Sequence, residues 1–303
     1  MVGALRRVWV CSPRAAGWDL AERAERWREL GFRHVPSFAG AQAQHEKMRR
    51  ELESAGAEVI EMMPAELFPG GLSSEEPSSS DPSGDALTLD AVYAHDASLA
   101  TDFGLILMRP GKSNRVAEAR QHGLLAEKID TPILGEIVAP GTAEAGDMVW
   151  LDAKTLLIGR GYRTNAEGIR QMSALLGSKG VTVVSAPLPH GAGSEVCLHL
   201  MSLMSLLDEN TALVDLAWLA VETVELLRSL GFKFIEIDDS ERDTLACNVL
   251  ALGGKRLLAI EENRKTNERL GRAGFDVRTF PGTELCINGG GGPTCLTRPL
   301  LRG

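Results

Sequence analysis

Long apolar runs are absent from this chain of 303 residues. No stretch approaches the roughly 18 apolar residues that a membrane-spanning helix needs, and the first eleven residues are too short and too basic in their middle for a signal peptide. We therefore expect a cytoplasmic protein without a membrane contact. Cysteine is also scarce. The five cysteines are odd in number and contain no Cys-x-x-Cys pair, which predicts reduced thiols and neither a disulfide frame nor a metal or other cofactor: Cys11, Cys197, Cys247, Cys286 and Cys295.

Basic charge is not in excess. The chain has 32 Lys and Arg against 41 Asp and Glu, a formal net charge of −9. This balance argues against nucleic acid and anionic membranes as partners and favours a small cationic substrate. With 44% hydrophobic residues the chain can bury a sizeable core, and its length suits one large domain or two small ones. We expect a single domain over residues 1–303, and a homodimer stays open.

A strand–helix–strand plan occurs four times, and a fifth copy is plausible near the N-terminus. Strands that alternate with helices of about 12 residues suggest a doubly wound sheet, whereas a repeat of roughly 50 residues suggests units that close into a ring. We favour the closed arrangement, an α/β propeller whose loops meet at a central channel. The copies cover residues 104–134, 155–184, 211–235 and 256–277, with the fifth over 8–60.

One segment breaks this plan. Residues 68–84, FPGGLSSEEPSSSDPSG, are rich in serine, proline, glycine and acid. Such a composition buries too little apolar surface to order itself, so we expect a flexible loop. A solvated loop and a lid over a site are both open.

A cysteine follows a run of four glycines near the C-terminus, in the sequence Asn288-Gly-Gly-Gly-Gly-Pro-Thr-Cys295. Glycine removes side chains and widens the backbone choices of the loop, so a ligand can approach closely. A thiol at this place suits nucleophilic chemistry, although a flexible tail with an incidental thiol remains an alternative. Cys286 is a rival nucleophile, which we expect in a strand and place behind Cys295.

A nucleophilic thiol needs a base or cation nearby. His199 lies in an apolar stretch and serves either a site or the core, whereas His34, His45, His122 and His190 look like surface groups. Acids gather at two places. Glu144 and Asp147 precede a strand at Met148-Val149-Trp150. Asp90 and Asp96 flank a segment that alternates like a strand, which would place both on one face. That face is either a solvated edge or a carboxylate pocket for a planar guanidinium.

These motifs together resemble the guanidino-group-modifying superfamily, which includes dimethylarginine dimethylaminohydrolases, arginine deiminases and amidinotransferases. The resemblance runs in order from about Asp90 to Thr297. It rests on Asp96, the Glu-x-Gly-Asp turn at 144–147, the Arg163-Thr-Asn-x-x-Gly helix start, the His199-Leu-x-Ser segment and the terminal Gly-Gly-Pro-Thr-Cys295. It implies a five-bladed α/β propeller, the pentein fold, in agreement with the repeat.

The resemblance also implies roles. Cys295 is expected to attack the guanidinium carbon, His199 to act as general acid and base, and Glu144 to hold the guanidinium. Asp96 and Asp90 would be further clamps, and Arg115 and Arg163 would grip the α-carboxylate of the substrate. On residues alone, both arginines would be surface charges at helix starts. Glu284 is an exposed turn residue with a modest chance of lining the site, and Asn248 is expected to hold a turn.

Three departures bear on the substrate. Ala145 replaces the first glycine of the usual Glu-Gly-Gly-Asp turn, and Met201 occupies a place where arginine deiminases carry an aspartate. The lost carboxylate leaves apolar room, which favours an N-substituted guanidine. Two signs point elsewhere: the glycine run resembles the deiminase loop, and His95 replaces an acid common before the clamp aspartate in dimethylargininases.

The leading hypothesis is a cysteine hydrolase that converts N-methylated arginine to citrulline and an alkylamine through a covalent thiouronium. The enzymatic alternatives are hydrolysis of unmodified arginine and amidino transfer. The alternative from another class is a propeller that serves only as a binding platform. Retention of Cys295, His199, Glu144 and Asp96 together argues against a scaffold, which needs none of them.

Overall fold

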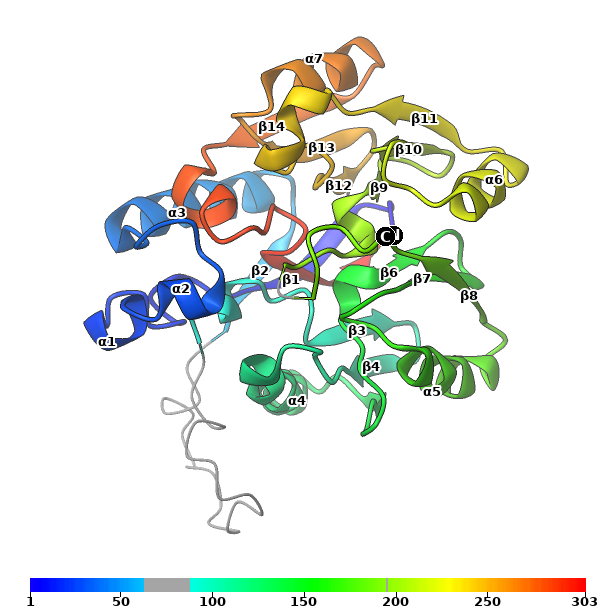
Figure 1. Cartoon of the computed structure of the whole chain (residues 1–303), viewed down its shortest axis with the longest axis horizontal. Coiled ribbons are helices and arrows are strands. Elements are labelled where there is room, and N and C mark those ends of the chain that lie inside the picture. The colour runs from blue at the N-terminus through cyan, green and yellow to red at the C-terminus, as the bar shows by residue number, and fades with distance from the viewer. Residues whose placement is uncertain (63–87, 195) are drawn as a thin grey trace.

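Five small sheets, each with three strands, surround a common centre (Figure 1). The computed structural model describes residues 1–62, 88–194 and 196–303. The five-fold arrangement confirms the predicted α/β propeller. The loop predicted at 68–84 lies outside the described residues, and the prediction of a single domain stays a prediction.

Each sheet repeats one topology. Its middle strand pairs antiparallel with one neighbour and parallel with the other, and a helix connects the two parallel strands. The first sheet differs because its antiparallel strand comes from the far end of the chain. In sheet order the strands are β15 (Thr297–Arg302), β1 (Leu5–Val10) and β2 (Glu58–Glu61); β3 (Ser98–Thr101), β4 (Gly104–Leu107) and β5 (Ile133–Glu136); β6 (Met148–Trp150), β7 (Thr155–Arg160) and β8 (Thr182–Pro187); β9 (Met204–Leu206), β10 (Thr211–Val214) and β11 (Lys233–Glu236); and β12 (Leu250–Gly253), β13 (Arg256–Ile260) and β14 (Asp276–Phe280).

The connecting helices lie on the outside of the ring (Figure 1). They are α3 (Phe38–Ser54), α4 (Val116–Lys128), α5 (Ala166–Gly177), α6 (Val221–Ser229) and α7 (Arg264–Arg272), preceded by two single turns, α1 (Ala21–Ala24) and α2 (Trp27–Leu30). After α3, α6 and α7 the chain turns at Gly56, Gly231 and Gly274, whose φ angles are 92°, 83° and 91°. Glycine adopts this left-handed conformation without a steric penalty, which explains why it follows each of these helices.

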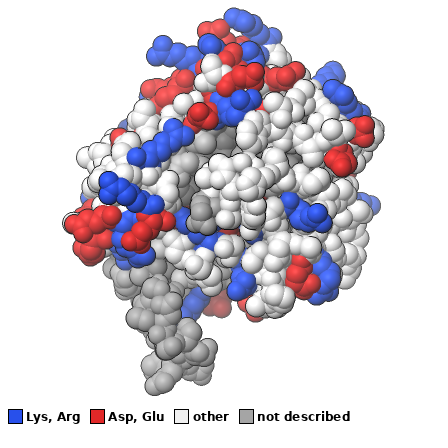
Figure 2. All heavy atoms as spheres, viewed as in Figure 1, with Lys and Arg blue, Asp and Glu red and all other residues white. Residues whose placement is uncertain are grey.

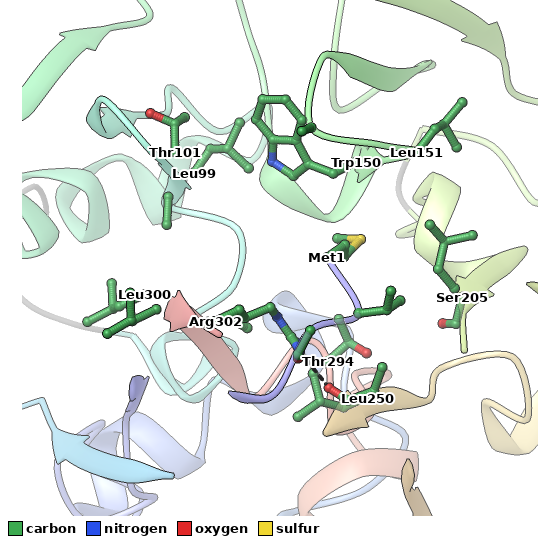
Figure 3. Close-up of a pocket in the computed structure, with 18 of the residues that line it drawn as sticks. Met1, Leu99, Thr101, Trp150, Leu151, Ser205, Leu250, Thr294, Leu300 and Arg302 are labelled. Carbon is green, nitrogen blue, oxygen red and sulfur yellow. Dashed lines mark hydrogen bonds between the residues drawn. The ribbon is translucent and has the colours of Figure 1, made fainter. Parts of the chain in front are cut away.

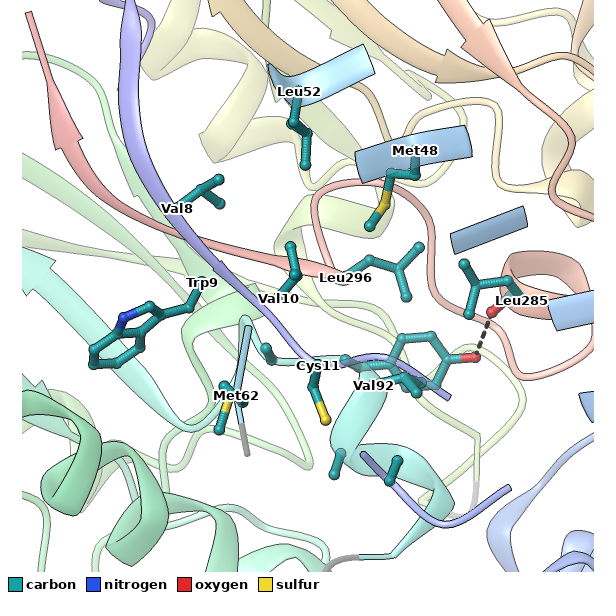
Figure 4. Packing of buried hydrophobic residues seen from close by; sticks show 14 of the residues in the cluster. Val8, Trp9, Val10, Cys11, Met48, Leu52, Met62, Val92, Leu285 and Leu296 are labelled. Carbon is teal, nitrogen blue, oxygen red and sulfur yellow. Dashed lines mark hydrogen bonds between the residues drawn. The ribbon is translucent and has the colours of Figure 1, made fainter. Parts of the chain in front are cut away.

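Apolar side chains fill the spaces between neighbouring sheets. One cluster joins Leu99 and Ile106 of the second sheet to Met148 and Leu156 of the third. Because the middle strands are covered on both faces, their buried stretches, such as residues 156–158 of β7 and 257–260 of β13, are continuously apolar and do not alternate. The largest cluster packs β1 against α3 and the segment after Cys295. Val8 and Val10 of β1, Met48 of α3 and Leu296 belong to it (Figure 4).

Two local predictions are wrong. The segment between Asp90 and Asp96 is not a strand, because residues Leu89–Val92 form a short 3-10 helix, η2, followed by turns. Cys286 is also not in a strand, since it lies in the single π-helical turn η7 (Thr283–Ile287). Alternation over six residues is too short to separate a strand from a tight helical turn whose residues are all buried.

Charged side chains gather over α7 and the neighbouring 3-10 helix η6 (Asp239–Thr244), whereas the middle of the face in Figure 2 carries few of them. Ion pairs such as Arg269–Asp238 and Arg272–Glu268 belong to this rim. None of the helices among the described residues is long and apolar enough to cross a membrane.

Candidate active site

Asn248 fixes the position of the Cys295 sulfur. Its amide Nδ2 donates to Cys295 Sγ at 3.0 Å, and its Oδ1 accepts from the backbone N–H of Thr294 at 2.9 Å. The preceding glycines leave room for this packing. A Cβ on Gly292 would lie 2.7 Å from the Asn248 amide, and one on Gly291 would meet the Tyr93 ring. The glycine run is therefore a tightly packed turn and not a flexible tail.

His199 and Glu144 form a buried pair. His199 Nε2 lies 2.7 Å from Glu144 Oε2, and both side chains are almost fully buried. The other carboxylate oxygen, Oε1, accepts from the backbone N–H of Gly111 at 2.9 Å and of Lys112 at 3.3 Å. His199 sits just before the 3-10 turn η5 (Leu200–Ser202), and Asp147 Oδ1 anchors that turn by accepting from Leu200 N–H at 2.9 Å.

Asp96 lies on the other side of the imidazole. Its Oδ1 is 3.8 Å from His199 Nδ1 and accepts from the backbone N–H of Gly146 at 3.1 Å. Its Oδ2 accepts from Arg115 at 2.6 Å. The residue before it, His95, donates its backbone N–H to the carbonyl of Cys295 at 3.0 Å. Through this bond the Cys295 segment is attached directly to the acid cluster, so groups from four distant parts of the chain meet at one place.

The charges of this cluster are interdependent. Burial alone would lower the pKa of His199, but Cys197, Asp96 and Asp147 raise it well above the usual range. Burial alone would raise the pKa of Glu144, but its hydrogen bond with His199 lowers it. The pair is therefore an imidazolium beside a carboxylate at neutral pH. Burial raises the pKa of the Cys295 thiol to about 12, with a further increase from Asp96, while His199 and Asn248 act in the opposite direction.

The remaining predicted residues have protein partners of their own. Asp90 Oδ2 is 2.5 Å from Lys112 Nζ. Arg115 is buried and donates to Glu118, Asp96 and the carbonyl of Tyr93. Every guanidinium nitrogen of Arg115 thus already bonds to the protein. Arg163 differs, since its Nη1 lies 3.7 Å from Glu144 Oε1 while its buried Nε has no partner.

Several expectations about single side chains are wrong. His45 and His122 are buried and not on the surface, and Asp90 and Asp96 form no solvated edge. Arg115 and Arg163 are likewise buried. Glu284 is partly exposed and accepts from Ser37 N–H. Sequence reasoning missed the contact of Asn248 with the sulfur and the role of Asp147 behind His199, because neither is visible without the tertiary fold.

Donor atoms of Glu144, Cys197 and His199 lie within 4.8 Å of one another. Cys197 Sγ is 3.6 Å from His199 Nδ1 and 3.7 Å from Nε2. A thiol, an imidazole and a carboxylate are a donor set that zinc accepts. The sequence-based expectation of no metal stays a prediction.

The model of the arginine deiminase family matches residues 89–224 and 219–302. The chain belongs to this family. Within it, the chain is similar to N(G),N(G)-dimethylarginine dimethylaminohydrolase of Pseudomonas aeruginosa, with 28% identity over 242 residues that cover 80% of this chain and 82% of the relative. The enzyme of the same name from Streptomyces coelicolor is 29% identical over 213 residues, covering 69% and 73%.

Solved structures agree with this membership. Dimethylarginine dimethylaminohydrolase from Pseudomonas aeruginosa, complexed with citrulline, superposes with a TM-score of 0.72 and 26% identity, covering 97% of this chain and 99% of that one. The N-terminal domain of ArgZ, a cyanobacterial arginine dihydrolase, gives a TM-score of 0.75 at 21% identity, covers 98% and 97%, and shows the shared fold alone. The predicted superfamily and its pentein fold are confirmed.

Proposed function

We propose that this protein is a cysteine hydrolase that cleaves a C–N bond of N-methylated arginine, giving citrulline and an alkylamine. The observation that carries the proposal is the convergence of the half-buried Cys295 with the buried His199–Glu144 pair and Asp96, since His199 and Asp96 are close enough to shift the pKa of the Cys295 thiol. The names of the similar enzymes from Pseudomonas aeruginosa and Streptomyces coelicolor support the same substrate class.

A guanidinium suits the electrostatics of the cluster. Two buried carboxylates, Glu144 and Asp96, flank the site and offer acceptors for its N–H groups. Arg163 has a buried, unpartnered Nε and is the better candidate for the α-carboxylate of the substrate. We assign Arg115 and Lys112 to positioning, because they hold Asp96 and Asp90.

The protonation states suggest an order of events. A thiol with a pKa near 12 is neutral in the free enzyme. A cation bound beside it lowers that pKa, so that the thiol proton passes to solvent. The thiolate then adds to the guanidinium carbon. His199, already protonated, gives its proton to the departing amine, and a thiouronium remains on Cys295.

Neutral His199 next takes a proton from water, whose oxygen attacks the thiouronium carbon. The C–S bond breaks and the sulfur leaves as a thiolate. The new hydroxyl group loses its proton to that thiolate, so citrulline departs and the thiol of Cys295 is restored. Holding the cation against the sulfur supplies proximity worth several kcal/mol of the barrier, and the positioned proton donor contributes about 10²–10⁴-fold.

Methylated arginine is favoured over arginine by the names of the similar enzymes from Pseudomonas aeruginosa and Streptomyces coelicolor. Met201, which supplies no carboxylate two residues after His199, is buried in the core and lines a neighbouring cavity. The test is to incubate the protein with asymmetric dimethylarginine or arginine and to assay citrulline, dimethylamine and ammonia. We expect citrulline and dimethylamine in equal amounts, and the folded Cys295→Ser variant should form neither.

Ammonia released from arginine at a comparable rate would assign the protein to the deiminase-type alternative. Citrulline formation without an added amine would exclude an obligate transferase. The absence of any turnover across a wider guanidine panel would favour the binding platform.

We also propose a cytoplasmic location, supported by the five cysteines, all of which are free thiols. The homodimer stays a prediction, which the mass measured by light scattering would check.

A further inference from the structure

A second cavity lies next to the catalytic cluster but is separate from it. Its volume is about 610 Å³, and none of Cys295, His199, Glu144 or Asp96 lines it. Apolar side chains such as Leu99, Trp150 and Leu250 form much of its wall, and Met1 and Arg302 also face it (Figure 3). The cavity is large enough for a small organic molecule with an apolar body.

Arg298 is a cation without a direct ion pair in the wall of this cavity, although Asp96 acts on it from a greater distance. It is buried, and none of the carboxylates among the described residues forms an ion pair with it. Its Nη2 lies 2.6 Å from Nε2 of His95, and its Nε has no partner. Burial lowers the pKa of His95 to about 3, so the ring is neutral and offers only a lone pair. A buried guanidinium with only a neutral partner is a costly arrangement that a bound anion would relieve.

Arg302 adds a second cation on the same strand, β15. Its Nη1 donates to the carbonyls of Gly3 and Ala251, both 2.8 Å away, and not to a carboxylate. Burial lowers the pKa of Arg298 to about 9 and that of Arg302 to about 10, and Arg302 contributes to the shift of Arg298. The two guanidinium groups therefore act on one another, and Asp96, which opposes this effect at Arg298, is itself paired with Arg115.

Acidic side chains also line the cavity, but they belong to its exposed edge. Asp102, Asp152 and Glu209 are exposed to solvent, and Asp208 is partly exposed. Hydrated carboxylates at the edge need no ligand, whereas the buried cations do. This difference in burial predicts the charge of the ligand. Its anionic group would lie inside the cavity beside the buried cations, and the rest of the ligand would pack against the apolar wall.

We propose that this cavity is a binding site for a small monocarboxylate with an apolar body, whose carboxylate pairs with the guanidinium of Arg298 in the field of Arg302. The site has a short connection to the catalytic cluster. Arg298 contacts His95, and the backbone N–H of His95 donates to the carbonyl of Cys295.

Sodium hexanoate is a suitable probe, titrated by calorimetry against hexylammonium chloride, which has the same tail and the opposite charge. We expect binding of hexanoate only. Arg298→Gln should raise the dissociation constant for hexanoate about tenfold or more, as expected for the loss of a charge-assisted pair. This variant should fold, because it removes a buried charge that has no counter-ion. Arg302→Gln should give a smaller loss in the same direction.

Arg170→Gln on α5 is the matched control, since it removes an exposed guanidinium far from the cavity and should leave hexanoate affinity unchanged. A second titration with the catalytic site saturated by citrulline should give the same dissociation constant. Three results would each overturn the proposal: equal binding of hexanoate and hexylammonium, unchanged hexanoate affinity in folded Arg298→Gln, or displacement of hexanoate by citrulline. None of these readouts needs turnover, so they are independent of the proposed activity.

Discussion

At the scale of single residues, Asn248 links Cys295, the proposed nucleophile, to the next blade. One amide group contacts both the sulfur of Cys295 and the backbone of Thr294. A hydrogen bond donated to sulfur stabilises the thiolate more than the thiol, and it lowers the pKa of Cys295 against the effect of burial. Asn248 touches the reacting atom, so we expect a catalytic effect and not only a structural one.

Asn248→Ala should therefore raise the thiol pKa and slow both turnover and alkylation of Cys295. The loss of a hydrogen bond to a charged group corresponds to about tenfold to hundredfold. Iodoacetamide labelling followed by peptide mass spectrometry, between pH 7 and 10, measures the alkylation rate at this site. Because burial keeps the thiol neutral, the rate should still rise with pH at the upper end of this range.

Asn263→Ala is the matched control. Asn263 is as buried as Asn248 and bonds with Thr244, away from the sulfur. It should reduce stability without changing the labelling of Cys295. If both variants alter labelling equally, Asn248 acts only through the fold.

The predicted site residues each lie in a recognisable local pattern, and their roles stay predictions. Cys295 follows the glycines, and Glu144 stands in a Glu-x-Gly-Asp turn. Their partners were not predictable. Lys112 next to Asp90 and Glu118 next to Arg115 occupy groups that sequence reasoning had assigned to the substrate. Pairing of this kind depends on how separate segments approach in space, which local patterns do not encode.

At the scale of elements, the 3-10 turn η4 (Ala145–Asp147) fits closely under the His199 imidazole. A Cβ on Gly146 would overlap His199 Nδ1 and lie 2.8 Å from Asp96 Oδ1. Gly146→Ala should push these two groups apart and reduce kcat/KM by about 10²-fold, the cost of a displacement near 1 Å. Steady-state kinetics with the preferred guanidine measures the effect.

The corresponding control is Gly177→Ala at the end of α5, where an added Cβ meets nothing within 4 Å. Alanine favours a helix more than glycine does, so this variant should keep full activity and gain stability of about 0.5–1 kcal/mol. A Gly146→Ala enzyme with wild-type kinetics would contradict the close fit under His199.

Helix α3 contains a buried histidine side chain without a hydrogen-bond partner. His45 lies on its buried face with Ala41 and Met48, and neither ring nitrogen has a partner. Burial lowers the pKa of His45 to about 4. The unfolded chain takes up a proton below about pH 6.5, and the folded chain does not. This residue therefore contributes a loss of stability as the pH falls from 6.5 towards 4.

His45→Leu should remove that contribution. We expect the stability lost between pH 7.5 and 5 to shrink by about 2 kcal/mol, as measured by urea unfolding at both pH values. His34→Leu, at an exposed ring, is the control, and its effect on the pH dependence should be smaller than that of His45→Leu. An unchanged pH dependence in His45→Leu would refute a neutral buried ring.

At the scale of the whole molecule, the ring is closed by the two ends of the chain. Strand β15 pairs antiparallel with β1, and Ala4 and Gly303 exchange two backbone hydrogen bonds of 2.8 Å. The repeat length predicted a ring, and the strand–helix–strand units were placed correctly. The closing strand was not assigned, because a strand that pairs across nearly the full chain length leaves no local pattern.

A circular permutant tests this closure. Joining residue 303 to residue 1 by a short glycine–serine linker, with new ends between Lys179 and Gly180, should preserve the fold and activity. Gly180 lies in a left-handed turn with open space around it. Circular dichroism and turnover check the result. A permutant opened inside β7, whose Leu156–Ile158 core is fully buried, should not fold.

Thr297, the first residue of β15, is only two positions beyond Cys295. Detachment of that strand from β1 would carry the sulfur away from the imidazole and both acids at once. A molecule whose C-terminal strand is detached should then lose its activity completely. The reactivity of Cys295 would therefore indicate whether the ring of sheets is closed.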